Sequence, residues 1–258
     1  MLGWPWRYVC ASVKGTSHAI SGLPCQDASL VTPIASDDPI LIATIADGAG
    51  SAAEAATGAR LVCSTFAELM IGHFARGGKV GDLAFDLTSQ YITEVIERLK
   101  VYAYGAELPL RDLASTFVAG VASSRELMCL QIGDGAIVVN DGEGYRAAFW
   151  PQSGEYVNTT FFLTDDSALT RLQHSLTQSA VDEIGCFTDG LQMLALRYSA
   201  KEVHVPFFRP LFERLRMEEP GESDLLTQQL ADWLDSQTIN SRTDDDKTLL
   251  LASRRLVS

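Results

Sequence analysis

The stretch Ile45-Ala46-Asp47-Gly48-Ala49-Gly50-Ser51 joins two different sequence patterns in this chain. Residues 39–45 before it predict a buried strand, because the run is apolar, short and bounded by proline and glycine. The residues from Ser51 onward predict a helix, with Ser51 as its N-cap and Glu54 completing a capping box. Asp47 at the junction either starts an Asp-Gly turn or is a metal ligand, with the Gly48 carbonyl as a second ligand.

Four other places carry an acid where a predicted strand begins or ends. Asp134 and Asp189 each follow a strand and precede a glycine, whereas Asp27 and the run Asp244 to Asp246 precede strands. If these strand ends converge, their carboxylates form a cluster, and two carboxylates about 4 Å apart repel by roughly 4 kcal/mol at an effective dielectric near 20. A cluster therefore implies a bound divalent metal or raised pKa values.

The cysteines and histidines argue against a zinc site or a disulfide framework. The five cysteines contain no C-x-x-C pair and the four histidines no H-x-x-x-H pair. Oxygen ligands alone favour Mg²⁺, Mn²⁺ or Ca²⁺ over zinc. Any metal in this protein is therefore expected to be held by carboxylates and carbonyls.

The composition is that of an acidic globular protein. The chain has 258 residues, is 47% hydrophobic and carries a formal net charge of −13, so it can bury a core but repels nucleic acid and anionic membranes. No apolar run is long enough to span a bilayer, and residues 1–6 lack the pattern of a signal peptide. We therefore expect a cytoplasmic protein, folded as a single domain over residues 1–258.

The periodicity of the remaining chain predicts alternating strands and helices. Predicted strands cover residues 6–13, 28–33, 116–121, 127–132, 136–139, 145–149, 183–188 and 248–252, and predicted helices cover 52–74, 82–104, 205–216 and 224–234. Tight turns between residues 116 and 149 predict one antiparallel meander. The polar, weakly periodic segment 151–180 is expected to form a surface flap.

The order of these motifs resembles that of the metal-dependent protein phosphatase 2C family, in its small bacterial members. The resemblance rests on six stretches, namely Pro24-Cys25-Gln26-Asp27-Ala28, Ala46-Asp47-Gly48-Ala49-Gly50-Ser51, Ser115-Thr116-Phe117, Ile132-Gly133-Asp134-Gly135, Thr188-Asp189-Gly190-Leu191 and Asp245-Asp246-Lys247-Thr248. Each stretch is weak evidence alone, but six in the family's order and nearly end to end are strong.

The resemblance implies an α+β fold, a four-layer αββα sandwich of two antiparallel sheets flanked by helix pairs. It also implies two Mn²⁺ or Mg²⁺ ions at one end of the sandwich. By residue match Asp47 would bridge both ions, the Gly48 carbonyl would bind one, and Asp189 and Asp245 would bind the other. Asp27 matches the acidic residue that follows the first loop and is a further expected metal ligand, and Asp134 matches the ligand of a weaker third ion.

The implied activity is hydrolysis of phosphoserine and phosphothreonine in proteins by a metal-bound hydroxide. Two ions about 3.5–4 Å apart can lower the pKa of a bridging water from 15.7 toward roughly 7, so that no protein nucleophile is needed. The catalytic residues would be Asp47, Asp189 and Asp245. The expected partner is a phosphorylated protein, either a Ser/Thr kinase or one of its targets, and the phosphatase is expected to be a monomer.

The chain departs from the family pattern at three positions. An Arg that grips the phosphate in much of the family is replaced by His18, so His18 or the nearby Lys14 is the candidate phosphate contact. Ala49 stands where the family often has a larger residue, which leaves no side-chain acid there to protonate the leaving group. Gly135 replaces the usual Ser after Asp134, which weakens the case for a third ion.

Two other functions are compatible with this sequence. One is a phospho-binding or scaffold module of the same fold with weak catalysis, as the His18 replacement suggests. The other is a metal-dependent phosphohydrolase of small molecules. Metal-independent binding of a partner would favour the first, and a preference for nucleotides or sugar phosphates over phosphopeptides would favour the second.

Overall fold

The computed structural model describes residues 5–152, 160–219 and 221–255. Its strands are β1 (Trp6–Val13), β2 (Ala28–Ile34), β3 (Ile40–Ala46), β4 (Phe117–Ala122), β5 (Leu127–Ile132), β6 (Ala136–Asn140), β7 (Tyr145–Ala147), β8 (Gln173–Thr177), β9 (Glu183–Phe187), β10 (Leu196–Arg197), β11 (Glu202–Val203) and β12 (Lys247–Arg254). Its α-helices are α1 (Thr16–Ser21), α2 (Ala55–Ala75), α3 (Phe85–Gly105), α4 (Ala168–Arg171), α5 (Gln192–Ala195), α6 (Val205–Arg216), α7 (Ser223–Leu234) and α8 (Gln237–Asn240).

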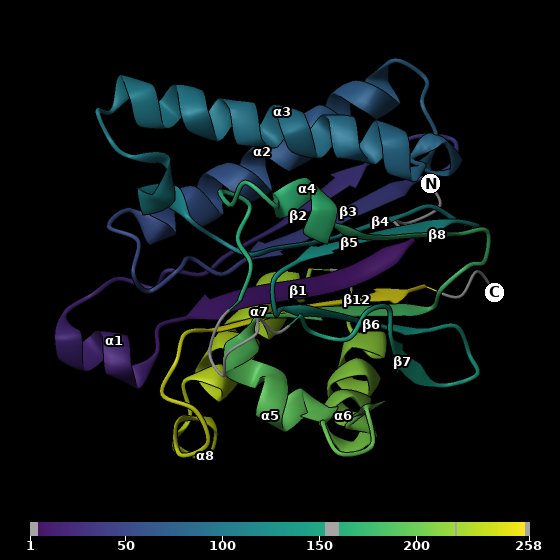
Figure 1. The fold of residues 1–258 in the computed structure, drawn as a ribbon. Helices are drawn as coiled ribbons and strands as arrows, with labels where there is room; N and C mark the ends of the chain where they lie inside the picture. Colours follow the sequence, from purple (N-terminus) through teal and green to yellow (C-terminus); the bar gives the residue numbers. More distant parts are fainter. Residues whose placement is uncertain (1–4, 153–159, 220, 256–258) are drawn as a thin grey trace.

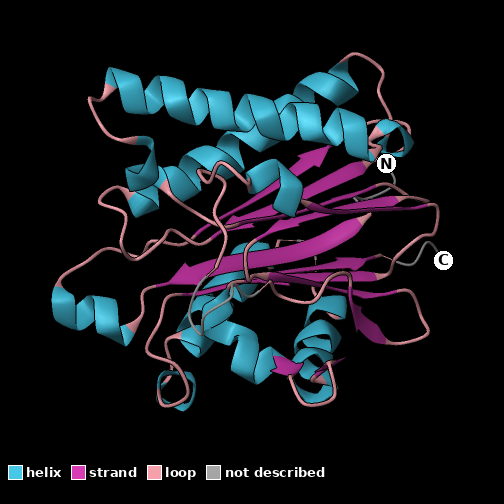
Figure 2. Cartoon of the chain, viewed as in Figure 1, coloured by secondary structure: helices cyan, strands magenta, loops and turns pink. Residues whose placement is uncertain are grey.

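Two antiparallel five-stranded sheets form the middle of the molecule, and helices cover both outer faces (Figures 1 and 2). One sheet has the strand order β2-β3-β4-β5-β8 and packs against α2 and α3. The other has the order β1-β12-β9-β6-β7 and packs against α6 and α7. The predicted four-layer αββα sandwich is therefore confirmed.

Strand β3 shows how the sequence produces these layers. All of its residues are buried, and alternate side chains point to opposite faces of the sheet. Ile40 and Ile42 pack with α2 and α3, whereas Leu41 and Ile45 pack between the two sheets. A strand buried on both faces is mainly apolar, which explains why this run shows no polar alternation. Its one polar side chain, Thr44, is buried and donates a hydrogen bond to the Leu30 carbonyl.

The register of the strands brings the predicted acids to one end of the sandwich. Ala28 pairs with Ala46, so Asp27 and Asp47 lie at the same edge of one sheet. In the other sheet Phe187 pairs with both Ala136 and Leu249. Asp189 lies two residues after Phe187, Asp134 lies two residues before Ala136, and Asp245 lies two residues before the start of β12. These acids therefore reach the same edge, and the two sheets present them to each other.

The expected meander is wrong in one respect, because the chain changes sheets halfway through it. Strands β4 and β5 pair in one sheet and β6 and β7 pair in the other. The crossing occurs at Gly133, whose φ of 96° lies in the left-handed region, and its N–H donates to Gln152 Oε1 at 2.7 Å. This crossing places Asp134 between the sheets instead of on an ordinary hairpin.

Both long helices begin later than expected. The capping box at Ser51 is wrong: α2 starts at Ala55, and the side chain of Glu54 accepts a hydrogen bond from Thr57 Oγ1. Helix α3 starts at Phe85, and Asp82 caps a preceding 3₁₀ turn by accepting from the Lys79 N–H. Turn hydrogen bonds of residues 49–54, such as that from Ala52 N–H to the Ala49 carbonyl, compete with the helix there.

The segment 151–180, expected to be a surface flap, is in large part packed onto the fold. Residues 153–159 lie outside the described part of the chain. Beyond them, Leu163, Ala168 and Leu172 are buried in the core beneath α2 and α3, and β8 forms the edge strand beside β5. Among the described residues, no helix is both long and apolar enough to cross a bilayer.

Candidate metal centre and catalytic cavity

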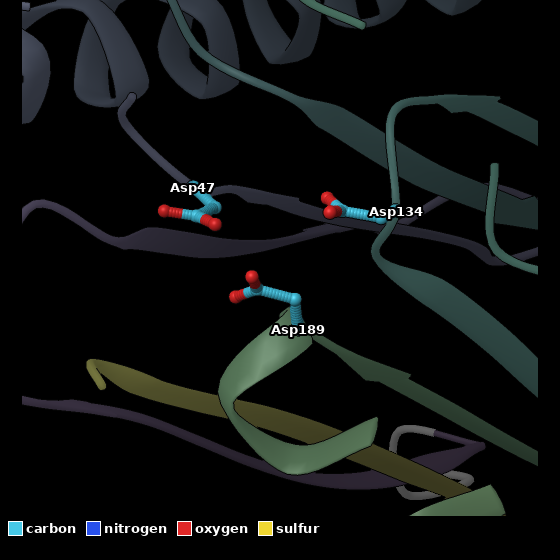
Figure 3. Close-up of side chains that lie close together, drawn as sticks. All are labelled: Asp47, Asp134 and Asp189. Atoms are coloured by element: carbon cyan, nitrogen blue, oxygen red, sulfur yellow. The ribbon is translucent and has the colours of Figure 1, made fainter. Parts of the chain in front are cut away.

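Asp47, Asp134 and Asp189 meet at the end of the sandwich. Each offers a carboxylate oxygen, and these three oxygens all lie within 4.8 Å of one another. Figure 3 shows the three side chains pointing toward a common space from three different chain segments. Asp47 follows β3, Asp134 lies between β5 and β6, and Asp189 follows β9. Asp134 comes 87 residues after Asp47, and Asp189 comes 55 residues after Asp134, yet the three side chains form one cluster of negative charge.

The backbone of Asp47 is fixed by two hydrogen bonds to Thr116. The Asp47 N–H donates to Thr116 Oγ1 at 3.0 Å, and the Thr116 N–H donates to the Asp47 carbonyl at 2.8 Å. Gly48 next to it forms an isolated bridge with Ser115. These contacts explain why the stretch Ser115-Thr116-Phe117, which contains no acid, is one of the motifs of the site.

Asp27 lies behind this cluster and not in the cavity. Its Oδ2 accepts a hydrogen bond from Thr188 Oγ1 at 2.8 Å, and Thr188 Oγ1 accepts one from the Thr248 N–H at 3.1 Å. Its Oδ1 is buried and has no hydrogen-bond partner among the described residues. Asp27 therefore adds a second buried carboxylate close to Asp47.

The acidic run before β12 divides into three different environments. Asp244 is exposed, Asp245 is half-buried and faces the cavity, and Asp246 is buried. Two glycines allow this turn to lie close to its neighbours: a Cβ on Gly15 would lie 2.3 Å from the Asp245 carbonyl carbon, and one on Gly190 would lie 2.0 Å from the Asp246 carbonyl oxygen. Only glycine fits at either position.

Burial and the charges of neighbouring acids raise the pKa values of four carboxyls, namely Asp27, Asp47, Asp134 and Asp189. Burial, followed by the charges of Asp134 and Asp245, raises the pKa of Asp189 to about 7. Burial is also the main reason that the pKa of Asp27 rises to about 7. The pKa of Asp47 lies well above its usual range because of burial and the charges of Asp27 and Asp189, and burial raises the pKa of Asp134.

These residues fit a divalent metal. Asp134 Oδ1, like Asp27 Oδ1, is buried without a hydrogen-bond partner among the described residues. A bound cation would give these oxygens a partner and would offset the repulsion that raises the pKa values. The donor set consists of carboxylates with the Gly48 carbonyl nearby, which suits Mg²⁺ or Mn²⁺ better than zinc.

The cluster opens into a cavity of about 780 Å³. Most of the predicted site residues line it, namely His18, Asp47, Gly48, Asp134, Asp189 and Asp245. Lys14 is exposed and is not among the residues that line it. Its position therefore does not support the prediction that Lys14 contacts the substrate.

One wall of the cavity consists of residues that sequence reasoning missed. Tyr198 and Lys201 belong to the turn of the β10–β11 hairpin, and Trp150 packs edge-on against Tyr198 at 5.3 Å between ring centroids. Gln192 accepts a hydrogen bond from the Tyr198 hydroxyl and donates to the Asp134 carbonyl at 2.5 Å. Lys201 has a φ of 52°, unusual for a residue with a side chain, and this geometry has no signal in the sequence.

The chain is similar in sequence to known protein phosphatases. The family model described as "Protein phosphatase 2C" matches residues 14–235. The chain is 39% identical to serine/threonine-protein phosphatase 3 of Escherichia coli (strain K12) over 249 residues, which cover 96% of this chain and 98% of the relative.

Solved structures share the fold at low sequence identity. The catalytic domain of the serine threonine protein phosphatase PstP, in complex with two manganese ions, superposes with a TM-score of 0.62 at 16% identity, covering 97% of this chain and 99% of PstP. RsbX in complex with magnesium superposes with a TM-score of 0.57 at 15% identity, covering 98% of each chain.

Proposed function

Because the chain belongs to the protein phosphatase 2C family, we propose that it is a metal-dependent phosphatase of phosphoserine and phosphothreonine in proteins. The observation that carries the proposal is the group of three carboxylates, within 4.8 Å of one another, at the base of an open cavity. A phosphomonoester is negatively charged and would be repelled by these acids alone. Phosphate binding at this place therefore requires cations.

We assign the cations to this chain's own ligands. Asp47, at the centre of the cluster, would hold two ions, one of them together with the Gly48 carbonyl. Asp189 and Asp245 would hold the second ion, and Asp134 would hold a weaker third. Asp27 remains in the ligand set because its Oδ1 is buried and has no partner in the described part of the chain. The PstP structure is a complex with two manganese ions and the RsbX structure a complex with magnesium, which supports Mn²⁺ or Mg²⁺ as the ions.

When bound, such ions activate a water molecule and neutralise phosphoryl charge. The protein supplies the geometry. The two hydrogen bonds with Thr116 fix Asp47, and the close packing of Gly190 on the Asp246 carbonyl fixes Asp189 next to Asp245. Strands of both sheets hold these residues, so the cluster is pre-organised before substrate binds.

The cavity suits a phosphorylated side chain on a polypeptide. It is open to solvent on one side of the molecule, and the Trp150 and Tyr198 rings with Lys201 form a wall that a peptide can contact. We propose that the substrate is a Ser/Thr kinase or one of its targets.

The test is phosphate release from a phosphothreonine peptide by the wild type and by Asp189→Asn, with Mn²⁺ and then with excess chelator. We expect turnover by the wild type only with metal, and a loss of at least about a hundredfold in the variant. A nucleoside monophosphate and a sugar phosphate serve as competing substrates. Faster hydrolysis of these than of the peptide would contradict the proposed substrate class.

A further inference from the structure

Asp246 lies next to a proposed metal ligand but uses both of its own oxygens elsewhere. Its Oδ1 accepts a hydrogen bond from the Gly15 N–H at 2.6 Å. Its Oδ2 accepts one from the Gln26 N–H at 2.6 Å and lies 2.9 Å from His18 Nδ1. The side chain is only 2% exposed, so Asp246 is a buried acceptor that joins three loops at the catalytic end of the sandwich.

His18 is thereby held with one edge of its ring toward Asp246. The imidazole lines the same cavity as Asp47, Asp189 and Asp245. Because Nδ1 faces the carboxylate, Nε2 is the nitrogen that remains for a group bound in the cavity. Nδ1 is buried and makes no aligned hydrogen bond among the described residues, although it lies 2.9 Å from the Asp246 carboxylate. In the imidazolium form the charge of the ring attracts this carboxylate, and Nε2–H can be donated in the cavity.

Besides His18, the described lining of the cavity offers two groups that could supply a proton to a departing alkoxide, the Tyr198 hydroxyl, which donates to Gln192, and the Lys201 ammonium. Ala49, in the loop beside Asp47, has no acidic side chain. Lys201 is the other cationic side chain among the described residues that line the cavity, and it lies on the hairpin turn after β10. A threonine alkoxide is a poor leaving group, so a proton donor for it can contribute about 10²–10⁴ in rate.

We propose that His18 is the catalytic proton donor to the leaving oxygen and that Asp246 is the residue that positions it. The proposal rests on the phosphatase function above. As water attacks phosphorus, the bond from phosphorus to the threonine Oγ breaks and its electron pair goes to Oγ. The Nε2 proton of His18 is transferred to Oγ, the products are threonine and inorganic phosphate, and neutral His18 regains a proton from solvent.

A different role for His18, a grip on the phosphate itself, makes different predictions. A residue that binds the phosphoryl group affects all phosphomonoesters alike and acts mainly on KM. A proton donor matters for threonine, whose alkoxide needs a proton, and matters little for p-nitrophenol, which leaves as a stable anion. Comparing substrates that carry these two leaving groups therefore distinguishes the proton-donor role from the phosphate-binding role.

The experiment compares His18→Ala, His18→Gln and the wild type with Mn²⁺ on a phosphothreonine peptide and on p-nitrophenyl phosphate. We expect kcat on the peptide to fall about a hundredfold in both variants, and kcat on p-nitrophenyl phosphate to fall less than about threefold. Ile20→Ala is the matched control, because Ile20 lies on the same helix and is 90% exposed. This control is expected to match the wild type on both substrates.

Asp246→Asn tests the positioning role. An amide offers one acceptor oxygen instead of two, so it cannot keep all three partners of Asp246. We expect the same selective loss on the peptide, together with a change in the ¹⁵N NMR signals of the His18 ring in the metal-free protein.

Equal losses on both substrates, or a rise in KM alone, would overturn the proton-donor role. Unchanged His18 ring signals in Asp246→Asn would overturn the positioning role. Failure of the phosphatase function itself looks different, because the wild type would then hydrolyse neither substrate with Mn²⁺. Circular dichroism of each variant separates these outcomes from a failure to fold.

Discussion

Replacing one carboxylate of the cluster should make the metal-free protein more stable while it weakens the binding of metal. In Asp189→Asn the amide keeps the size of the side chain and removes its charge. The pKa of Asp189 rises from 3.8 to about 7 on folding. Ionising such a carboxyl in the folded protein costs up to about 4 kcal/mol above pH 7, at about 1.4 kcal/mol for each pH unit.

The sign of the pH dependence follows from proton binding. Between pH 4 and pH 7 the folded state holds a proton on Asp189 that the unfolded chain has lost, so wild-type stability falls as the pH rises. The variant lacks this carboxyl, so its stability should fall less than that of the wild type over the same pH range. Because a buried amide still carries a desolvation cost, we expect Asp189→Asn to be more stable than the wild type by about 2 kcal/mol at pH 8 and nearly equal at pH 4.

The assay is urea unfolding with excess chelator and reductant at both pH values, repeated at pH 8 with Mn²⁺. A ligand at a hundred times its Kd stabilises the folded state by about 2.7 kcal/mol, so saturating Mn²⁺ should reverse the order of the two proteins. The reasoning is refuted if the variant is the less stable protein in chelator at pH 8. It is also refuted if Mn²⁺ stabilises both proteins equally.

Three further substitutions test the packing, two of them beside the cavity and one at the far end of β9. Gly190→Ala places a Cβ 2.0 Å from the Asp246 carbonyl oxygen, so thermal unfolding should show a loss of about 1–3 kcal/mol, and an unchanged Tm would contradict the close approach. Lys201→Gly relieves a φ of 52° and should raise stability by about 0.5 kcal/mol in urea unfolding, whereas a loss would show that this backbone is not strained. Arg216→Ala removes the cation paired with the buried Glu183 carboxylate and should lower the free energy of unfolding by about 2 kcal/mol. An unchanged free energy of unfolding would contradict this expectation.

Much of the fold could be predicted because its strands are defined by local pattern. The bounds of β1 at residues 6–13 match the prediction, and α6 was also placed correctly at 205–216. The acids Asp47, Asp134 and Asp189 could be found because each sits beside a glycine where an apolar run ends. Antiparallel pairing then brings such ends together without further information from the sequence.

Other features depend on contacts between distant segments. The change of sheet after β5 is decided at Gly133 by packing with Gln152, not by the spacing of the apolar residues. Asp245 and Asp246 are adjacent in a run of three acids, and only the turn geometry sends one to the cavity and the other to His18.

The wall that includes Tyr198 and Lys201 was missed because its two strands are only two residues long each. So short a hairpin carries no periodic pattern in the sequence. Its position depends on the contacts of Gln192 and Trp150 with Tyr198, which join it to the cavity.

The central claim is that carboxylates of this cluster hold the metal on which phosphoester hydrolysis depends. The most direct measurement is the binding of Mn²⁺ by isothermal titration calorimetry to the wild type and to Asp47→Asn, with phosphate release from a phosphothreonine peptide followed at each Mn²⁺ concentration. We predict two ions for each wild-type chain, with activity rising as they bind, and loss of both binding and activity in the variant. Equal Mn²⁺ binding by the two proteins, or wild-type activity that persists in chelator, would contradict the account.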